Sequence, residues 1–214
     1  MTFNIAAVGK KFNSCLTDDD VLIREFCDAY VEVCGLLSFF GKIFYFVAKD
    51  VDEKINILYE YANREPVLYK SVKSMTSHEA SVGVSGDVYN KDVIGSRTIL
   101  RLNRALLFLA DLIELLCTAP DNQSLRKLTK DTYDVDLGPY HPWYVRKAVS
   151  FAVYSLPQRE ELISHIIDTQ PKDGTIHGKE ACRSAMLDYA LPAMRTVFDR
   201  TNQWLGYHEQ LHLP

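Results

Sequence analysis

Residues 93–117 read VIGSRTILRLNRALLFLADLIELLC, and this stretch decides the fold. Its apolar side chains recur at intervals of three and four residues, which is the pattern of an α-helix. The dipeptide Ala119-Pro120 then predicts where the helix stops, because proline cannot continue it. Apart from a few charged positions the helix is too apolar to lie on a surface, so we expect it to be largely buried.

The segments on either side extend the helical pattern. Asp18–Asp20 is expected to cap a helix entering at Val21 and running on toward Val51, with Gly35 and Gly41 marking a bend or a join. Further helices are expected at about 123–136, 142–154, 157–169 and 178–210, with a kink at Pro192, and loops at 80–92 and 170–178. No internal repeat is visible, and no linker segment divides the chain into two domains. The sequence predicts one all-α domain over residues 1–214, with about eight helices.

Composition excludes several classes of protein. The 214 residues are 47% apolar, and 24 basic against 28 acidic side chains give a net charge of −4, which argues against nucleic-acid binding. No secretory signal is visible, and the most apolar window, Val33–Ala48, is broken by Lys42 and too short to span a membrane. The five cysteines form no CxxC pair, and no His or Cys spacing suits a metal. We expect a cytosolic protein with reduced cysteines, no metal and no cofactor.

Three arginines stand out on the long central helix. Arg97, Arg101 and Arg104 are four and three residues apart, which places them on one stripe, and no acid lies between Val93 and Ala110. One interpretation is a solvated face whose aliphatic stems cover apolar surface. The other is an anion site, because guanidinium groups match the geometry of phosphate and carboxylate.

Two other segments carry candidate binding residues. Asp50 and Lys54 are four residues apart on a predicted helix and share a face, although such a pair is most often a surface salt bridge. His141 precedes Pro142 where a helix is expected to begin, and the positive end of the helix dipole would keep its imidazole neutral. Capping or packing is the simpler interpretation of His141, and core packing that of Trp143.

Together these segments resemble the glycolipid transfer protein superfamily, and within it the ceramide-1-phosphate transfer protein branch. The matching strings are GKIFYFVAKDVDEKI at 41–55, GSRTILRLNRAL at 95–106, YHPWYVRKAVSFAVYSLPQRE at 140–160, and the terminal LHLP. The resemblance covers most of the chain in order and is weak at 60–92 and 165–205. It implies a two-layer all-α sandwich that binds one sphingolipid, with the headgroup in a surface cleft and the chains in an apolar pocket.

The resemblance also implies roles for five residues. Asp50 would accept a hydrogen bond from the lipid amide N–H, and His141 would donate one to the amide carbonyl. This fits their chemistry, since a carboxylate only accepts and a neutral imidazole can donate. Lys54, Arg97 and Arg101 would hold the phosphate, which brings a charge of roughly −1.5 to −2 at neutral pH.

The same positions separate the two branches of the superfamily. Sugar-binding members have a tryptophan platform where this chain has Arg97, and an asparagine where it has Lys54, so the resemblance implies ceramide-1-phosphate as the cargo. Arg104 is given no direct lipid contact; it either orients the site or pairs with an acid such as Asp111. Trp143 matches the tryptophan that docks on membranes, and Trp204 is expected to be structural.

The expected function is therefore that of a cytosolic, monomeric carrier that docks transiently on a membrane surface. Trp143 would insert while Arg146 and Lys147 meet anionic headgroups. No GxxxxGK[ST] loop is present, so transfer would need no energy input. The alternatives are a non-transferring phosphosphingolipid sensor or adaptor, a glycosphingolipid carrier, and a phospholipid-processing enzyme with His141 as base and Asp50 as partner. No GxSxG motif supports the enzyme, so we expect none.

Overall fold

The computed structural model describes residues 3–40, 45–83, 94–172, 174 and 176–214, and these form helices and connecting loops, with no strand among them. The α-helices are α1 (Ile5–Ser14), α2 (Ile23–Cys34), α3 (Tyr45–Arg64), α4 (Val72–Ser81), α5 (Gly95–Thr118), α6 (Leu125–Asp136), α7 (Trp143–Ala152), α8 (Arg159–Asp168), α9 (Gly178–Ala185) and α10 (Leu191–Tyr207). Short 3-10 helices, η1 (Gly35–Phe40), η3 (Gly138–Tyr140) and η4 (Val153–Ser155), lie between some of them in the part of the chain that is described. The all-α prediction is confirmed.

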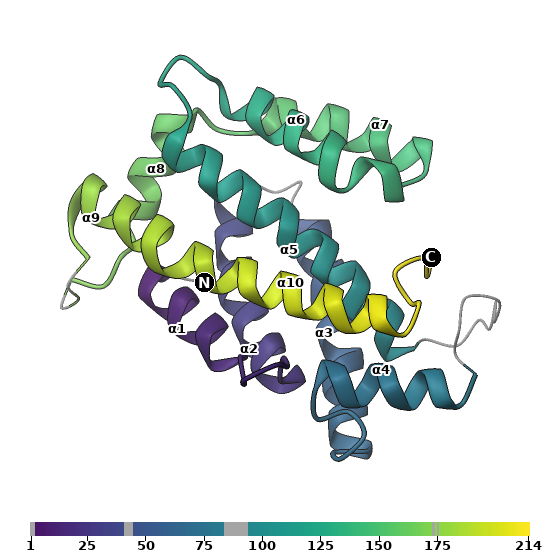
Figure 1. Ribbon diagram of the computed structural model, residues 1–214. Helices are drawn as coiled ribbons and strands as arrows, with labels where there is room; N and C mark the ends of the chain where they lie inside the picture. Colours follow the sequence, from purple (N-terminus) through teal and green to yellow (C-terminus); the bar gives the residue numbers. More distant parts are fainter. Residues whose placement is uncertain (1–2, 41–44, 84–93, 173, 175) are drawn as a thin grey trace.

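The helices pack in two layers. Helices α1, α2 and α3 lie side by side in one layer, and α10, α5 and α6 lie side by side in the other (Figure 1). Contacts of α1 with α10 and of α3 with α5 hold the layers together. One buried bond crosses between them, since the hydroxyl of Tyr30 on α2 donates to the main-chain oxygen of Leu102 on α5 over 2.9 Å. The long helix predicted from residues 93–117 is α5, at the centre of its layer.

Both ends of α5 are held by buried charges. At its start, the Glu79 carboxylate from α4 accepts hydrogen bonds of 2.8 Å from the main-chain N–H groups of Gly95 and Ser96. At its end, the Arg159 guanidinium from α8 donates to the main-chain oxygens of Leu116, Ala119 and Pro120. An anion at the N-terminus and a cation at the C-terminus both stabilise a helix dipole. The position of the three arginines is therefore fixed from both ends.

Glycine is required where Glu79 meets α5. A Cβ atom on Gly95 would lie 2.5 Å from the sulfur of Met75, 2.9 Å from the Tyr69 ring and 3.0 Å from the Glu79 carboxylate. A real side chain would push α4 away and break the cap. The Tyr69 hydroxyl donates to the same carboxylate over 3.0 Å, so Glu79 is satisfied although it is only 2% exposed.

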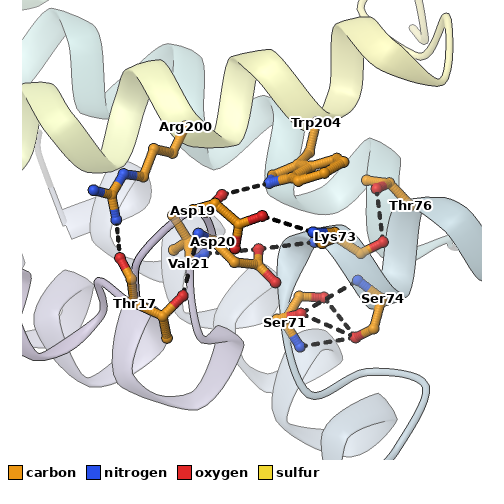
Figure 2. Close-up of polar contacts among 10 residues, drawn as sticks. All are labelled: Thr17, Asp19, Asp20, Val21, Ser71, Lys73, Ser74, Thr76, Arg200 and Trp204. Carbon is orange, nitrogen blue, oxygen red and sulfur yellow. Dashed lines mark hydrogen bonds and ion pairs between the residues drawn. The ribbon is translucent and has the colours of Figure 1, made fainter.

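The predicted cap at Asp18–Asp20 is wrong. Short antiparallel bridges, Leu16 with Val21 and Leu22 with Ser71, keep this chain extended, and α2 begins only at Ile23. The Asp20 carboxylate instead accepts from the main-chain N–H groups of Val21 and Lys73, at 2.7 and 3.0 Å. Figure 2 shows how this loop lies between α4 and α10. Asp20 thus joins the first loop to α4 rather than starting α2.

The helix boundaries differ from the sequence prediction in two further ways. The expected segment from Val21 to Val51 is divided, because α2 ends at Cys34 and η1 begins at Gly35, one of the two glycines expected to mark a bend or a join. Helices α1 and α4 were not predicted at all. Gly41 and most of the expected loop at 80–92 lie outside the described residues.

The C-terminal helical segment is continuous from Gly178 to Tyr207. A π-helical turn (η5, Met186–Ala190) joins α9 to α10 directly before Pro192. Proline lacks the N–H that an α-helix needs, and the wider turn before it accommodates that loss, while the kink expected at Pro192 stays a prediction. Among the described residues, none of the helices is long and apolar enough to cross a membrane.

Candidate functional site

The predicted Asp50–Lys54 pair forms on α3. Lys54 Nζ lies 2.6 Å from Asp50 Oδ1 and 3.4 Å from the Asp50 main-chain oxygen. The two side chains differ in exposure, because Asp50 is 66% exposed whereas Lys54 is 16% exposed. A surface pair would leave both in water. Here the lysine side chain is mostly covered, whereas its carboxylate partner is open to solvent.

The arginines on α5 have distinct surroundings. Arg101 is exposed and donates from Nε to the main-chain oxygen of Pro214 over 3.1 Å, and Arg97, one turn earlier, is partly buried. Arg104 donates from Nη2 to the main-chain oxygen of Leu211 over 2.8 Å, and its guanidinium lies 3.8 Å from the centre of the Tyr140 ring. Burial lowers the pKa of Arg104, and the neighbouring Arg101 acts in the same direction.

The suggested pairing of Arg104 with Asp111 does not occur. Asp111 lies two turns further along α5 and pairs with Arg195 of α10 at 2.5 Å. Arg195 also reaches Glu114 at 2.5 Å.

His141 follows η3 directly and precedes α7. Its Nδ1 lies 2.7 Å from the Tyr133 hydroxyl of α6, and when that hydroxyl donates, the proton of a neutral ring resides on Nε2. Burial lowers the pKa of His141, Asp50 opposes the shift, and Lys54 and Arg101 add to it. The predicted neutral imidazole is supported, although burial and neighbouring cations cause it, rather than the helix dipole named from the sequence.

The electrostatic environment of His141 shows which predicted residues gather. Asp50 and Lys54 from α3 and Arg101 from α5 are all close enough to shift its pKa. Arg97 shares the stripe of Arg101 on a helix that packs against α3. Three cations, one carboxylate and one neutral imidazole can bind a dianionic group beside an amide: the cations balance the charge, the carboxylate accepts and the imidazole donates.

A cavity of about 430 Å³ lies at the other end of α5, and its wall has apolar side chains as well as charged ones, among them Arg159, Lys179 and Glu180. Isoleucine and leucine side chains from α5 and α8 make up much of its wall: Ile113, Leu116, Ile163, Ile166 and Ile167. At 1.5 Å per residue, Ile113 is about 18 Å along the helix from Arg101. A long alkyl chain anchored near the arginines can cover that distance.

A pair of carboxyl groups lies where α6 meets α5. Asp136 of α6 is buried beside Asp111, and burial together with the charge and hydrogen bond of Asp111 raises the pKa of Asp136 to about 6. The cationic Arg195 opposes the shift. Two adjacent carboxyl groups form a hydrogen bond only when one holds a proton, so this contact strengthens in mild acid.

We expect Asp136→Asn to stabilise the protein at neutral pH. Asp136 binds its proton more tightly in the folded state than in the unfolded state, so wild-type stability should fall as pH rises from about 4 to about 6. The asparagine amide donates to Asp111 without titrating. A groove lined by both residues is open to water, and water screens their interaction. The gain in the free energy of unfolding should therefore be about 1 kcal/mol, which is less than the value that the full pKa shift of Asp136 corresponds to. Urea denaturation of both proteins at several pH values measures their free energies of unfolding. A difference between variant and wild type that stays constant from about pH 4 to about pH 6 would contradict the prediction.

Helix α7 presents apolar side chains to solvent. Trp143 is 68% exposed, and no residue of the helix is buried. Core packing of Trp143 is therefore excluded. Tyr144, Phe151 and, just after the helix, Tyr154 are exposed as well, and so are the basic residues Arg146 and Lys147. Aromatic rings beside basic side chains suit the interface of an anionic membrane.

Two residues near the site were missed from the sequence. Tyr133 contacts His141, and Tyr140 contacts Arg104. Tyr140 lies inside one of the strings that carry the family resemblance, but nothing in the spacing indicates a contact with an arginine on α5. Trp204 is structural as predicted, since its Nε1 donates to the main-chain oxygen of Asp19 over 2.8 Å.

A comparison with known families agrees with this geometry. The model of the family "Glycolipid transfer protein (GLTP)" matches residues 21–168, which span α2 to α8. The chain belongs to the glycolipid transfer protein family. The ceramide-1-phosphate transfer proteins of Xenopus tropicalis and Homo sapiens are each 31% identical to it, over 99% of this chain and 97% of theirs.

Solved structures extend the likeness from sequence to fold. The crystal structure of human ceramide-1-phosphate transfer protein in complex with 12:0 ceramide-1-phosphate matches with a TM-score of 0.87 at 31% identity, over 99% of this chain and all of that one. The apo form of the mouse protein gives a TM-score of 0.88 at 28% identity. A fungal glycolipid transfer protein, HET-C2, shares the fold at 17% identity and a TM-score of 0.71. The two-layer sandwich expected of this family is therefore confirmed.

Proposed function

We propose that this protein is a carrier that takes ceramide-1-phosphate from one membrane and releases it at another without energy input. One observation carries the proposal: Lys54 and Arg101, from different layers, both act on the same neutral His141. Cations beside a neutral donor suit a phosphate attached to an amide-bearing lipid. The relatives named for ceramide-1-phosphate transfer, and the related human complex with that lipid, give independent support.

Within this proposal, five residues bind the headgroup region. Lys54, Arg97 and Arg101 hold the phosphate, Asp50 accepts from the amide N–H, and His141 donates from Nε2 to the amide carbonyl. The Asp50–Lys54 pair keeps the lysine charge balanced until the lipid arrives. The chains extend toward the isoleucine and leucine side chains that line the cavity at the far end of α5.

We further propose that the protein works as a monomer in the cytosol and touches membranes transiently. Every residue assigned to the headgroup site comes from one chain, so no partner is needed to complete it. All five cysteines are free, and four of them are buried, which suits a reducing compartment. The exposed aromatic and basic residues of α7 are the proposed docking surface.

Trp143→Ala is expected to slow transfer between vesicles by about tenfold. Removing an indole that inserts at the headgroup level weakens docking, whereas binding of a short-chain, water-soluble ceramide-1-phosphate should be unchanged. Because the side chain is exposed, unfolding should be unaffected. Tyr207→Ala, which removes an equally exposed ring from α10, is the control. Equal transfer by the tryptophan variant and wild type would exclude α7 as the docking surface.

A vesicle assay with product analysis tests the carrier itself. Donor vesicles containing ceramide-1-phosphate are mixed with acceptor vesicles and purified protein, and the lipid in each population is identified by mass spectrometry. The expected result is intact lipid accumulating in the acceptors in proportion to protein. Lipid bound but not transferred would indicate a sensor or adaptor, and lipid chemically changed would indicate an enzyme.

A further inference from the structure

Residues 208–214, the C-terminal strap, lie against the arginine stripe of α5. The main-chain oxygen of Leu211 accepts from Arg104 Nη2 over 2.8 Å, and that of Pro214 accepts from Arg101 Nε over 3.1 Å. Two of the three arginines of the stripe are therefore held by the C-terminal residues of the chain. Figure 1 shows the strap turning back from α10 toward α5.

The strap has a defined conformation of its own. Glu209 has a φ of 57°, in the left-handed region, which reverses the chain after α10. Gln210 is fully buried; its N–H donates to the Leu205 main-chain oxygen over 2.8 Å and its side-chain amide to that of Thr76 on α4 over 3.4 Å. Leu213 is buried as well. The two buried side chains fix where the oxygens of Leu211 and Pro214 lie.

The helix that carries the strap is anchored independently. Trp204 donates to the main-chain oxygen of Asp19, and Arg200 donates to that of Thr17 (Figure 2). Lys73 of α4 pairs with the Asp19 carboxylate at 2.7 Å and lies 4.4 Å from the centre of the Trp204 ring. The first loop, α4 and α10 are thus joined at the base of the strap.

We propose that the C-terminal strap is a positioning element for the phosphate site, an inference that rests on the proposed function. A guanidinium has five N–H donors in a fixed plane, and it grips phosphate best through two parallel N–H groups. Holding Nε of Arg101 with an oxygen sets the plane of the group and directs its two terminal nitrogens away from the strap.

Arg104 extends the same arrangement to the histidine. It links the Leu211 oxygen of the strap to the ring of Tyr140, the residue before His141. The strap, α5 and the segment that presents His141 are thereby joined through one side chain. Arg104 acts through its neighbours, so it is a positioning residue and does not itself hold the lipid.

The test compares two variants that differ in main-chain oxygens. Deletion of residues 211–214 removes both acceptors, whereas the matched double variant Leu211→Ala/Pro214→Ala shortens two side chains and retains both. Dissociation constants are measured by titration with phosphatidylcholine vesicles carrying either ceramide-1-phosphate or ceramide with the same acyl chain. Ceramide lacks the phosphate, so it reports any general damage to the fold or to the chain pocket.

The deletion is expected to weaken ceramide-1-phosphate binding about tenfold and ceramide binding less than twofold, while the double variant matches wild type. Equal losses for both lipids would show a merely structural role and overturn the proposal. Tighter binding of ceramide-1-phosphate after deletion would overturn it too, because the strap would then compete with phosphate. Wild-type protein that binds ceramide-1-phosphate no better than ceramide would instead refute the proposed function.

Discussion

Arg101→Glu is expected to reduce ceramide-1-phosphate transfer by at least about 100-fold. The substitution removes charge-assisted hydrogen bonds to the phosphate and places an anion beside it, and each such bond contributes about 1.5–3 kcal/mol. Arg101 is exposed on a helix held at both ends, so the fold should tolerate the change. Transfer between vesicles at equal protein concentration measures the effect, with circular dichroism as the check on helix content.

The control for Arg101→Glu must change the net charge equally. Arg64→Glu does so at the end of α3, where the side chain is 74% exposed. This variant should transfer ceramide-1-phosphate at a rate within twofold of wild type. If Arg101→Glu and Arg64→Glu behave alike, the arginine stripe is a solvated face, and the phosphate site has been misassigned.

Glu79→Ala is expected to destabilise the protein by about 3 kcal/mol. The carboxylate accepts from two main-chain N–H groups at the start of α5 and from the Tyr69 hydroxyl, and truncation leaves these buried donors without an acceptor. For a chain of this size that loss corresponds to a fall of about 6–12 °C in Tm. Glu79→Gln keeps one acceptor oxygen and should cost less. Differential scanning calorimetry of the three proteins should give the highest Tm for wild type, an intermediate Tm for Glu79→Gln and the lowest for Glu79→Ala.

A second glutamate separates this buried cap from an ordinary helix-dipole effect. Glu161 lies in the first turn of α8 and is exposed, so Glu161→Ala should cost less than about 1 kcal/mol. The difference between the stability losses of Glu79→Ala and Glu161→Ala measures how much burial adds to the contribution of a glutamate near a helix N-terminus. Similar losses at both positions would mean that Glu79 contributes through the dipole alone, and that α5 does not depend on α4 for its start.

Sequence patterns predicted α5 best because its signal is local. The apolar period is long and uninterrupted, and Ala119-Pro120 ends it. Helix α4 carried no such signal, since VKSMTSHEAS has few apolar residues and several weak helix formers. It folds because Ser71 and Ser74 form a capping box and because Met75 and Glu79 are buried against its neighbours. Packing overrides propensity there, and packing is not visible in a single segment.

The sequence predicted those parts of the candidate site whose residues lie three or four positions apart on one helix. The Asp50–Lys54 pair and the arginine stripe follow from spacing alone, while the proximity of His141 came from resemblance to a family. The partners of Arg104 and Asp20 could not be found in this way, because Leu211 and Lys73 are more than fifty residues away in sequence. Side chains that form hydrogen bonds with main-chain groups of distant segments leave no residue pattern to recognise.

The measurement that tests the central claim most directly is headgroup preference. Purified protein is given donor vesicles that contain either ceramide-1-phosphate or galactosylceramide with the same acyl chain, and initial transfer rates are compared. Lys54, Arg97 and Arg101 favour a phosphate and offer no platform for a sugar, so ceramide-1-phosphate should transfer at least about tenfold faster. Equal rates, or faster transfer of galactosylceramide, would contradict the assignment of these three residues to a phosphate site.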